Sequence, residues 1–144
     1  MSGKKFGYSL QVRWSDSDRL GHVNNTRFVE YLQEARAHFL TECMQAAEGV
    51  RGGSVVRKLT VDFLRPIFDA SGPLQIEVSI SRIGLTSFAV RHLVRDAESA
   101  LCADAEAVMV MFDLKAQAPR PITDRERAVF SDYLDASEGR SESE

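Results

Sequence analysis

Every second residue is apolar from Tyr8 to Trp14. This period of two predicts a half-buried strand. From about Asn25 the apolar residues recur at helical spacing, and a polar loop over residues 15–25 separates the two patterns. Glu48 and the glycines after it predict the end of this long helix. Its apolar face consists of Phe28, Leu32, Ala35, Phe39 and Cys43.

Four more segments with alternating apolar residues follow the helix. The connections between them are too short to hold a crossover helix, so we expect the strands to pair antiparallel. After these segments, Thr123 and Glu126 have the spacing of a capping box, which predicts a last short helix. The four segments span residues 59–63, 74–81, 88–94 and 101–114.

A long helix with one apolar face must bury that face against another element. The order of elements therefore predicts an α+β fold in which the helix is wrapped by a five-stranded antiparallel sheet. We expect a single domain over residues 1–135 and a disordered tail over residues 136–144, because the tail has almost no apolar side chains. The second sheet face and the long edge strand also need covering, which predicts a homo-oligomer.

Composition narrows the class of protein. Of the 144 residues, 44% are hydrophobic and 27% are charged, as in soluble globular domains. The formal charge of -3 argues against a protein whose main task is to hold a nucleic-acid backbone. No apolar run reaches the roughly 20 residues of a membrane span, and the N-terminus does not resemble a signal peptide, so we expect a cytoplasmic location. Cys43 and Cys102 match no metal or redox spacing.

The loop before the helix holds two carboxylates, Asp16 and Asp18, which admit three interpretations. A calcium loop fails because Leu20 has no ligand atom and Arg27 stands where a bidentate Glu is required. A phosphatase nucleophile pair is disfavoured because no continuous apolar strand precedes it. A catalytic carboxylate beside a helix N-terminus remains. The residues alone leave open whether the two aspartates do chemistry or only solvate the loop and cap the helix.

Other polar residues of the loop are less specific. His22 is either a ligand contact or a structural loop residue. Asn24 and Asn25 are N-cap types whose side chains can bond a substrate or hold the loop. The sequence contains no serine nucleophile elbow, no Gly-rich phosphate loop and no HExxH metal helix. If the protein is an enzyme, an aspartate is therefore its reagent, and no metal site is expected.

Four stretches together resemble a known family. WSDSDRLGHVNNTRFVEYLQEAR (residues 14–36) resembles the opening motif of the 4-hydroxybenzoyl-CoA thioesterase-like group of hotdog-fold acyl-CoA thioesterases. VDFLRPI (61–67), RIGLTSF (82–88) and LCADAEAVMVMFD (101–113) match in order and spacing. The resemblance implies a hotdog fold, that is, a long helix wrapped by an antiparallel sheet. It also implies dimers or tetramers with active sites between subunits, and hydrolysis of an acyl-CoA thioester.

The resemblance also implies roles for particular residues. Asp18 would be the catalytic carboxylate, as nucleophile or as general base, and the backbone N–H of Asn25 would hold the oxyanion. Ser87 and Phe88 match a segment that lines the acyl or pantetheine path. No cofactor is implied. The candidates for binding the CoA nucleotide are Arg57, Lys58, Arg91 and Arg95.

The nature of the acyl group stays open. His22 and Asn24, the expected substrate contacts in the loop, belong to a stretch that resembles the broader acyl-CoA thioesterases more than the aromatic-substrate members. Two alternatives to a thioesterase remain. One is a non-catalytic module that binds acyl thioesters. The other is a hotdog-fold hydratase of enoyl thioesters, although the Asp–His pair that such enzymes use has no good match here.

Overall fold

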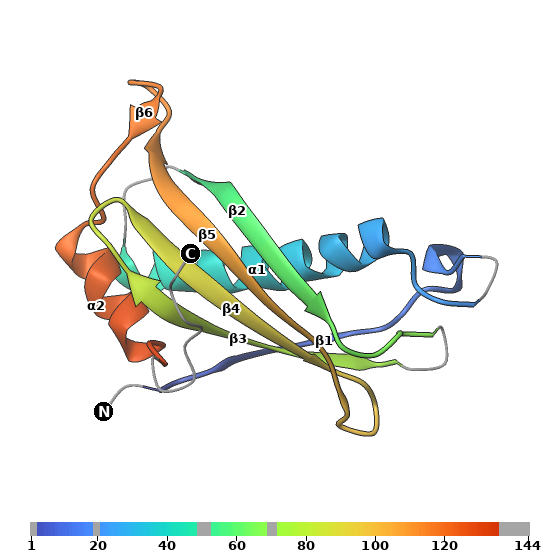
Figure 1. The fold of residues 1–144 in the computed structure, drawn as a ribbon. Coiled ribbons are helices and arrows are strands. Elements are labelled where there is room, and N and C mark those ends of the chain that lie inside the picture. The colour runs from blue at the N-terminus through green and yellow to red at the C-terminus, as the bar shows by residue number, and fades with distance from the viewer. Residues whose placement is uncertain (1–2, 19–20, 49–52, 69–71, 136–144) are drawn as a thin grey trace.

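A 23-residue helix, α1 (Asn25–Ala47), lies across one face of an antiparallel sheet (Figure 1). The computed structural model describes residues 3–18, 21–48, 53–68 and 72–135. A short 3-10 helix, η1 (Trp14–Asp16), precedes α1, and a second helix, α2 (Asp124–Asp132), follows the sheet. The strands are β1 (Phe6–Leu10), β2 (Gly53–Phe63), β3 (Leu74–Ile83), β4 (Ser87–Arg95), β5 (Leu101–Asp113) and β6 (Ala118–Pro119).

The strand order is β1-β3-β4-β5-β2, and every neighbouring pair is antiparallel. The predicted α+β class is therefore confirmed, with the two-residue β6 added beside the end of β5. The first strand is shorter than the alternation predicts. It ends at Leu10 because the chain turns into η1 at Trp14. The predicted tail, residues 136–144, lies outside the described residues.

Helix α1 buries the face that the sequence predicts. Its five predicted core residues are all buried, and they are joined there by the aromatic ring of Tyr31. Asn24 is the N-cap, and Glu48 closes the helix in the left-handed region at φ 51. At the other end of the chain, Thr123 and Glu126 form the predicted capping box of α2. Local sequence signals thus set the ends of both helices.

Strand β2 forms one edge of the sheet. Among the described residues it pairs with β5 alone, so no other strand lies along its outer edge. Large apolar side chains are exposed along it: Val55 and Val56 are each 46% exposed, and Phe63 is 51% exposed. An eleven-residue edge with exposed apolar side chains is the kind of surface that another chain covers.

Candidate functional site

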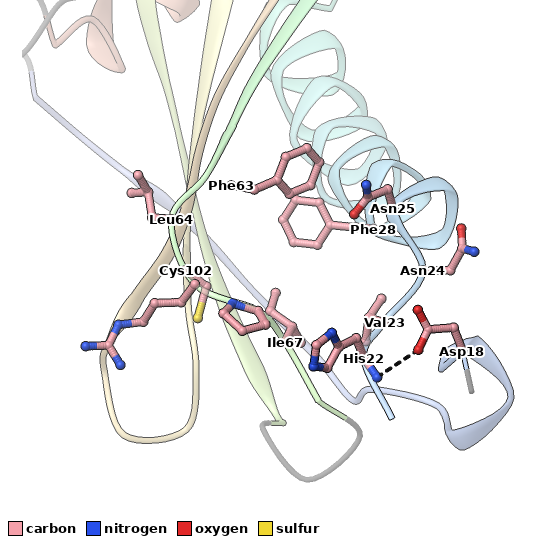
Figure 2. A pocket seen from close by; sticks show the side chains of 12 residues that line it. Asp18, His22, Val23, Asn24, Asn25, Phe28, Phe63, Leu64, Ile67 and Cys102 are labelled. Atoms are coloured by element: carbon pink, nitrogen blue, oxygen red, sulfur yellow. Dashed lines mark hydrogen bonds between the residues drawn. The ribbon is translucent and has the colours of Figure 1, made fainter. Parts of the chain in front are cut away.

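A cavity of about 520 Å³ opens at the N-terminal end of α1 (Figure 2). One side is the loop and first turn of the helix, which contribute Asp18, His22, Asn24 and Asn25. The other side is the end of β2 and the segment after it, residues 63–67. The structure therefore brings together all four of the loop residues that the sequence selected, and it does so around an open space large enough for a small ligand.

Backbone hydrogen bonds hold Asp18 in a tight turn. Its N–H donates to the carbonyl of His22 at 2.7 Å, and its carbonyl accepts from the N–H of Gly21 at 3.0 Å. The carboxylate oxygen Oδ1 accepts from the N–H of His22 at 3.2 Å (Figure 2). Gly21 has φ +82, a left-handed conformation that favours glycine. The turn thus fixes an exposed carboxylate at the wall of the cavity.

The start of α1 supplies a backbone donor to the same cavity. The side chain of Asn24 accepts from the N–H of Thr26 at 2.8 Å, and its carbonyl accepts from Phe28 at 2.9 Å. The N–H of Asn25 belongs to the first helical residue, so it has no acceptor within the helix. No other acceptor bonds it within the part of the chain that the structure describes. Together with the positive end of the helix dipole, this N–H can hold a negative oxygen.

Asp16 ties the loop to the helix. The residue is only 7% exposed, and its side chain accepts a 2.6 Å hydrogen bond from the hydroxyl of Tyr31. Its carbonyl accepts from the N–H of Asn24 at 3.0 Å, and Arg13 approaches the carboxylate at 3.2 Å. Burial and the bond to Asp16 raise the pKa of Tyr31 to about 12, so this hydroxyl remains a donor. Asp16 therefore connects the residue before Asn25 to the second turn of α1.

The opposite wall of the cavity is mainly apolar. The ring of Phe63 on this wall lies 5.4 Å from the ring of Phe28 on the helix side, and Figure 2 shows both beside Asn25. Val23 donates its N–H to the carbonyl of Ile67 at 2.7 Å, which joins the loop to the segment after β2. Sequence reasoning missed this wall. The signal was present in the VDFLRPI motif, which contributed to the resemblance but was given no role in the site.

Ser87 and Phe88 lie away from this cavity within one protomer. Ser87 pairs with Val110 of β5, whereas Cys102, eight positions earlier on β5, is the residue of that strand that lines the cavity. Phe88 is fully buried and its ring stacks on Phe130 at 4.5 Å. The structure therefore does not join these two residues to Asp18 in a single chain, and their assignment to the acyl path stays a prediction.

The candidate basic residues are also distributed over several surfaces. Arg91 lies 2.9 Å from Asp104 in an ion pair, and Arg95 lies 3.9 Å from Glu77. The other two, Arg57 and Lys58, are exposed on the edge strand β2. Arg65, which the sequence did not single out, lines the cavity itself. Among the described residues that line the cavity, it is the one arginine or lysine.

The two cysteines are free thiols. Cys102 lines the cavity but is buried, and burial raises its pKa. Burial also raises the pKa of Cys43 to about 12, which leaves it a neutral core side chain. Among the described residues, no group of three His, Cys, Asp or Glu side chains could hold a metal ion. In the same part of the chain, no helix is long and apolar enough to cross a bilayer.

Known proteins are similar to this chain in sequence and in fold. The family model of the Thioesterase-like superfamily matches residues 12–130. The acyl-CoA thioester hydrolase YbgC of Escherichia coli is 28% identical over 125 residues, which cover 85% of this chain and 92% of that protein. A thioesterase of Thermus thermophilus, complexed with coenzyme A and Zn, is 29% identical with a TM-score of 0.75, over 86% of this chain and 90% of its own.

A third likeness concerns the fold alone. The 1,4-dihydroxy-2-naphthoyl-CoA thioesterase Slr0204 of Synechocystis has a TM-score of 0.75 at 22% identity, over 90% of this chain and 97% of its own. The helix and the sheet that carry the cavity are therefore a shared arrangement. The family match itself runs through the loop, the helix and strands β2 to β5.

Proposed function

The chain belongs to the thioesterase-like superfamily, and we propose that, as an acyl-CoA thioesterase, it hydrolyses its substrate with Asp18 as the catalytic carboxylate and the Asn25 N–H as the oxyanion donor. One observation carries this proposal. A carboxylate and a helix N-terminal N–H that bonds no acceptor among the described residues line the same cavity, and these are the two groups that the proposed hydrolysis uses. The acyl-CoA activity of the E. coli relative supports the choice of substrate.

The chemistry follows from these two groups. As the carbonyl carbon of the thioester is attacked, its oxygen becomes negative and is held by the N–H of Asn25 and by the helix dipole. Asp18 acts in one of two ways. As a general base it takes a proton from water while the water oxygen attacks. As a nucleophile it attacks first, and water then opens the acyl–Asp anhydride. Either route breaks the C–S bond and releases a carboxylate and CoA.

The loop residues His22 and Asn24 position the two proposed catalytic groups. His22 fixes the Asp18 carboxylate through its backbone N–H, and its ring packs against Phe68 at 4.7 Å between centroids. Asn24 accepts from the N–H of Thr26 through its side chain, and the neighbouring N–H of Asn25 bonds no acceptor among the described residues. These contacts make His22 and Asn24 positioning residues that also line the substrate cavity.

The active enzyme is a homodimer in which β2 pairs with β2 of a second copy. Two observations support this. The outer edge of β2 has no strand partner among the described residues, and Phe63, a cavity residue, is half exposed at the same edge. Pairing two such edges closes both and completes the cavity wall. Analytical ultracentrifugation should show a dimer, and a fully active monomer would contradict this arrangement.

Release of CoA thiol from a panel of acyl-CoAs tests the proposed function. We expect wild type to release thiol and Asp18→Asn to lose about 100-fold or more in kcat, because the amide can neither attack nor take a proton. Asp132→Asn is the matched control, since Asp132 is exposed on α2, far along the chain from the loop. This control should keep wild-type activity.

The other outcomes favour the alternatives. Undiminished hydrolysis by Asp18→Asn would remove Asp18 from the mechanism. Tight acyl-CoA binding without thiol release by wild type would favour a non-catalytic binding module. Hydration of an enoyl-CoA without thiol release would favour a hydratase.

A further inference from the structure

A second cavity, of about 570 Å³, lies between the C-terminal half of α1 and the start of β2. Its apolar lining comes from Leu40, Met44 and Met111. Within one chain it is remote from the first cavity, because Leu40 is fifteen residues after Asn25, about 22 Å along a helix. Its volume is in the range of ordinary ligand sites, and none of its described lining residues has an ionisable side chain.

The two cavities meet opposite ends of the same edge strand. Phe63, at the end of β2, lines the first cavity, and Ser54, at its start, lines the second. Both point to the α1 side of the sheet, because they pair with Ala103 and Met111 of β5, which are core residues. Between them the strand has one irregularity, at Arg57, which the pairing with β5 skips.

The residues that become neighbours in a symmetric antiparallel pairing of two β2 strands depend on where the two-fold axis lies. Residues that face each other across such a pair must point to the same side of the sheet. We place the two-fold axis at Leu59, the middle of residues 53–64 when Arg57 is skipped as it is beside β5, because this register pairs the edge over its whole length and meets the same-side condition. Phe63 then lies opposite the partner's Ser54, and Leu64 lies opposite the partner's Gly53. The pairing therefore sets the wall of the first cavity directly beside the wall of the partner's second cavity.

We propose that the first cavity of one protomer and the second cavity of its partner join into one substrate channel, and that the second cavity holds the tail of an extended aliphatic acyl group. This inference rests on the proposed function. With the thioester carbonyl held at Asp18 and Asn25, the acyl tail passes Phe63 and enters the space lined by the partner's Leu40, Met44 and Met111. The preferred substrates are thioesters of unbranched chains too long for the first cavity.

Hydrolysis of saturated acyl-CoAs from about four to sixteen carbons measures this directly. For wild type, kcat/KM should rise by up to about fourfold for each methylene that enters the second cavity. Thr41→Trp fills that cavity from the helix side without touching the edge of β2, and should lower kcat/KM at least tenfold for long chains while leaving the shortest unchanged. Met44→Ala enlarges the cavity and should move the optimum to longer chains. Ala37→Trp, exposed on the same helix outside both cavities, is the matched control.

Mixed dimers test whether the second cavity acts on the partner's site. They are purified with a different tag on each protomer. In a dimer of wild type with an Asp18→Asn, Thr41→Trp double variant, the one competent Asp18 faces a blocked partner cavity, so long-chain activity should be lost. In a dimer of Asp18→Asn with Thr41→Trp, the competent Asp18 faces an open partner cavity, so long-chain activity should remain.

The results that would contradict this inference differ from the result that would contradict the proposed function. The reverse pattern in the two mixed dimers would mean that the second cavity acts on the active site of its own protomer, and it would overturn the proposal. An unchanged chain-length profile in Thr41→Trp, with hydrolysis intact, would overturn it as well and leave the proposed function standing. No thiol release by wild type at any chain length would remove the proposed function and this inference together.

Discussion

The hydroxyl of Tyr31 donates a 2.6 Å hydrogen bond to the buried carboxylate of Asp16. This bond joins the loop that carries Asp18 to the second turn of α1. The first residue of the same helix, Asn25, has the N–H proposed above as the oxyanion donor. Because the carbonyl of Asp16 also accepts from Asn24, a single residue sets the position of the loop against the helix start. Asp16 therefore keeps the proposed catalytic aspartate and the proposed oxyanion donor in place relative to each other without needing to touch substrate.

Removing that bond should slow catalysis without weakening binding. Tyr31→Phe keeps the buried ring but leaves the Asp16 carboxylate without its donor, so we expect kcat to fall about tenfold with KM nearly unchanged. Tyr8→Phe is the matched control, because Tyr8 donates to Glu34 on the same helix but away from the cavity. Equal kcat values for the two variants, measured by thiol release, would show that the Tyr31–Asp16 bond is only structural.

Replacing Asn25 by proline should test the oxyanion donor alone. Proline lacks the N–H but is well suited to the first position of a helix, and Asn24 before it already has the extended ψ of 140 that a following proline requires. We expect Asn25→Pro to fold with little loss of stability and to lose about 100-fold to 1000-fold in kcat. Asn25→Ala keeps the N–H and should stay active. An active proline variant would move the oxyanion donor to another group.

The sequence predicts the parts of this site that depend on local pattern. The start of α1, its buried face and the residues of the tight turn all follow from spacing within some twenty residues, and the structure agrees. The apolar wall could not be found in this way. Phe63 and Ile67 reach the cavity through the path of the chain after β2, about forty residues beyond the loop, and no local pattern gives that placement.

Partners of buried polar groups are unpredictable for the same reason. Asp16 near a helix start is typical of a cap, but the structure gives the cap to Asn24 and bonds Asp16 to Tyr31. The register of β4 beside β5 sets Arg91 directly opposite Glu106, yet its ion pair is with Asp104, two positions along β5 on the same face. Pairing across strands is set by tertiary structure, so sequence spacing indicates the group but not its partner.

A buried histidine should make stability depend on pH. His92 is fully buried, and its Nε2 lies 3.3 Å from Nη1 of Arg36, which can only donate. Burial and the Arg36 charge lower the pKa of His92 from 6.5 to about 3. Between these two pKa values, His92 is protonated in the unfolded chain and neutral in the folded chain. The contribution is therefore constant above pH 6.5 and is lost as the pH falls towards 3, by up to about 1.4 kcal/mol per pH unit.

Urea denaturation of wild type beside His92→Gln, from about pH 7.5 to pH 5, checks this pH dependence. Glutamine keeps an acceptor for Arg36 but does not titrate, so the variant should lose less stability than wild type over the acidic half of the range. Parallel stability curves for the two proteins would show that His92 is protonated in the folded state at these pH values.

Removing only one partner of the ion pair between Arg120 and Glu126 should lower the free energy of unfolding more than replacing both partners by apolar residues. Glu126 is fully buried and bonds Arg120 through both oxygens, at 2.9 and 2.8 Å. Burial alone would raise the pKa of Glu126, but the bonds from Arg120 and Thr123 outweigh it and lower that pKa. Arg120→Met leaves a buried charge unpaired, so unfolding free energy should fall by about 3–5 kcal/mol.

Two further variants separate this effect from a simple loss of contacts. The double variant Arg120→Met, Glu126→Met removes both charges, and it should recover part of the lost stability because no unpaired charge is left in the core. Arg125→Met breaks only the exposed pair with Glu48, whose side chains are 70% and 77% exposed, and it should unfold at the same urea concentration as wild type. If the double variant has a lower free energy of unfolding than Arg120→Met, an unpaired buried charge is not the cause of the lost stability. The pair would then stabilise α2 through the cap of the helix and the geometry of the two bonds.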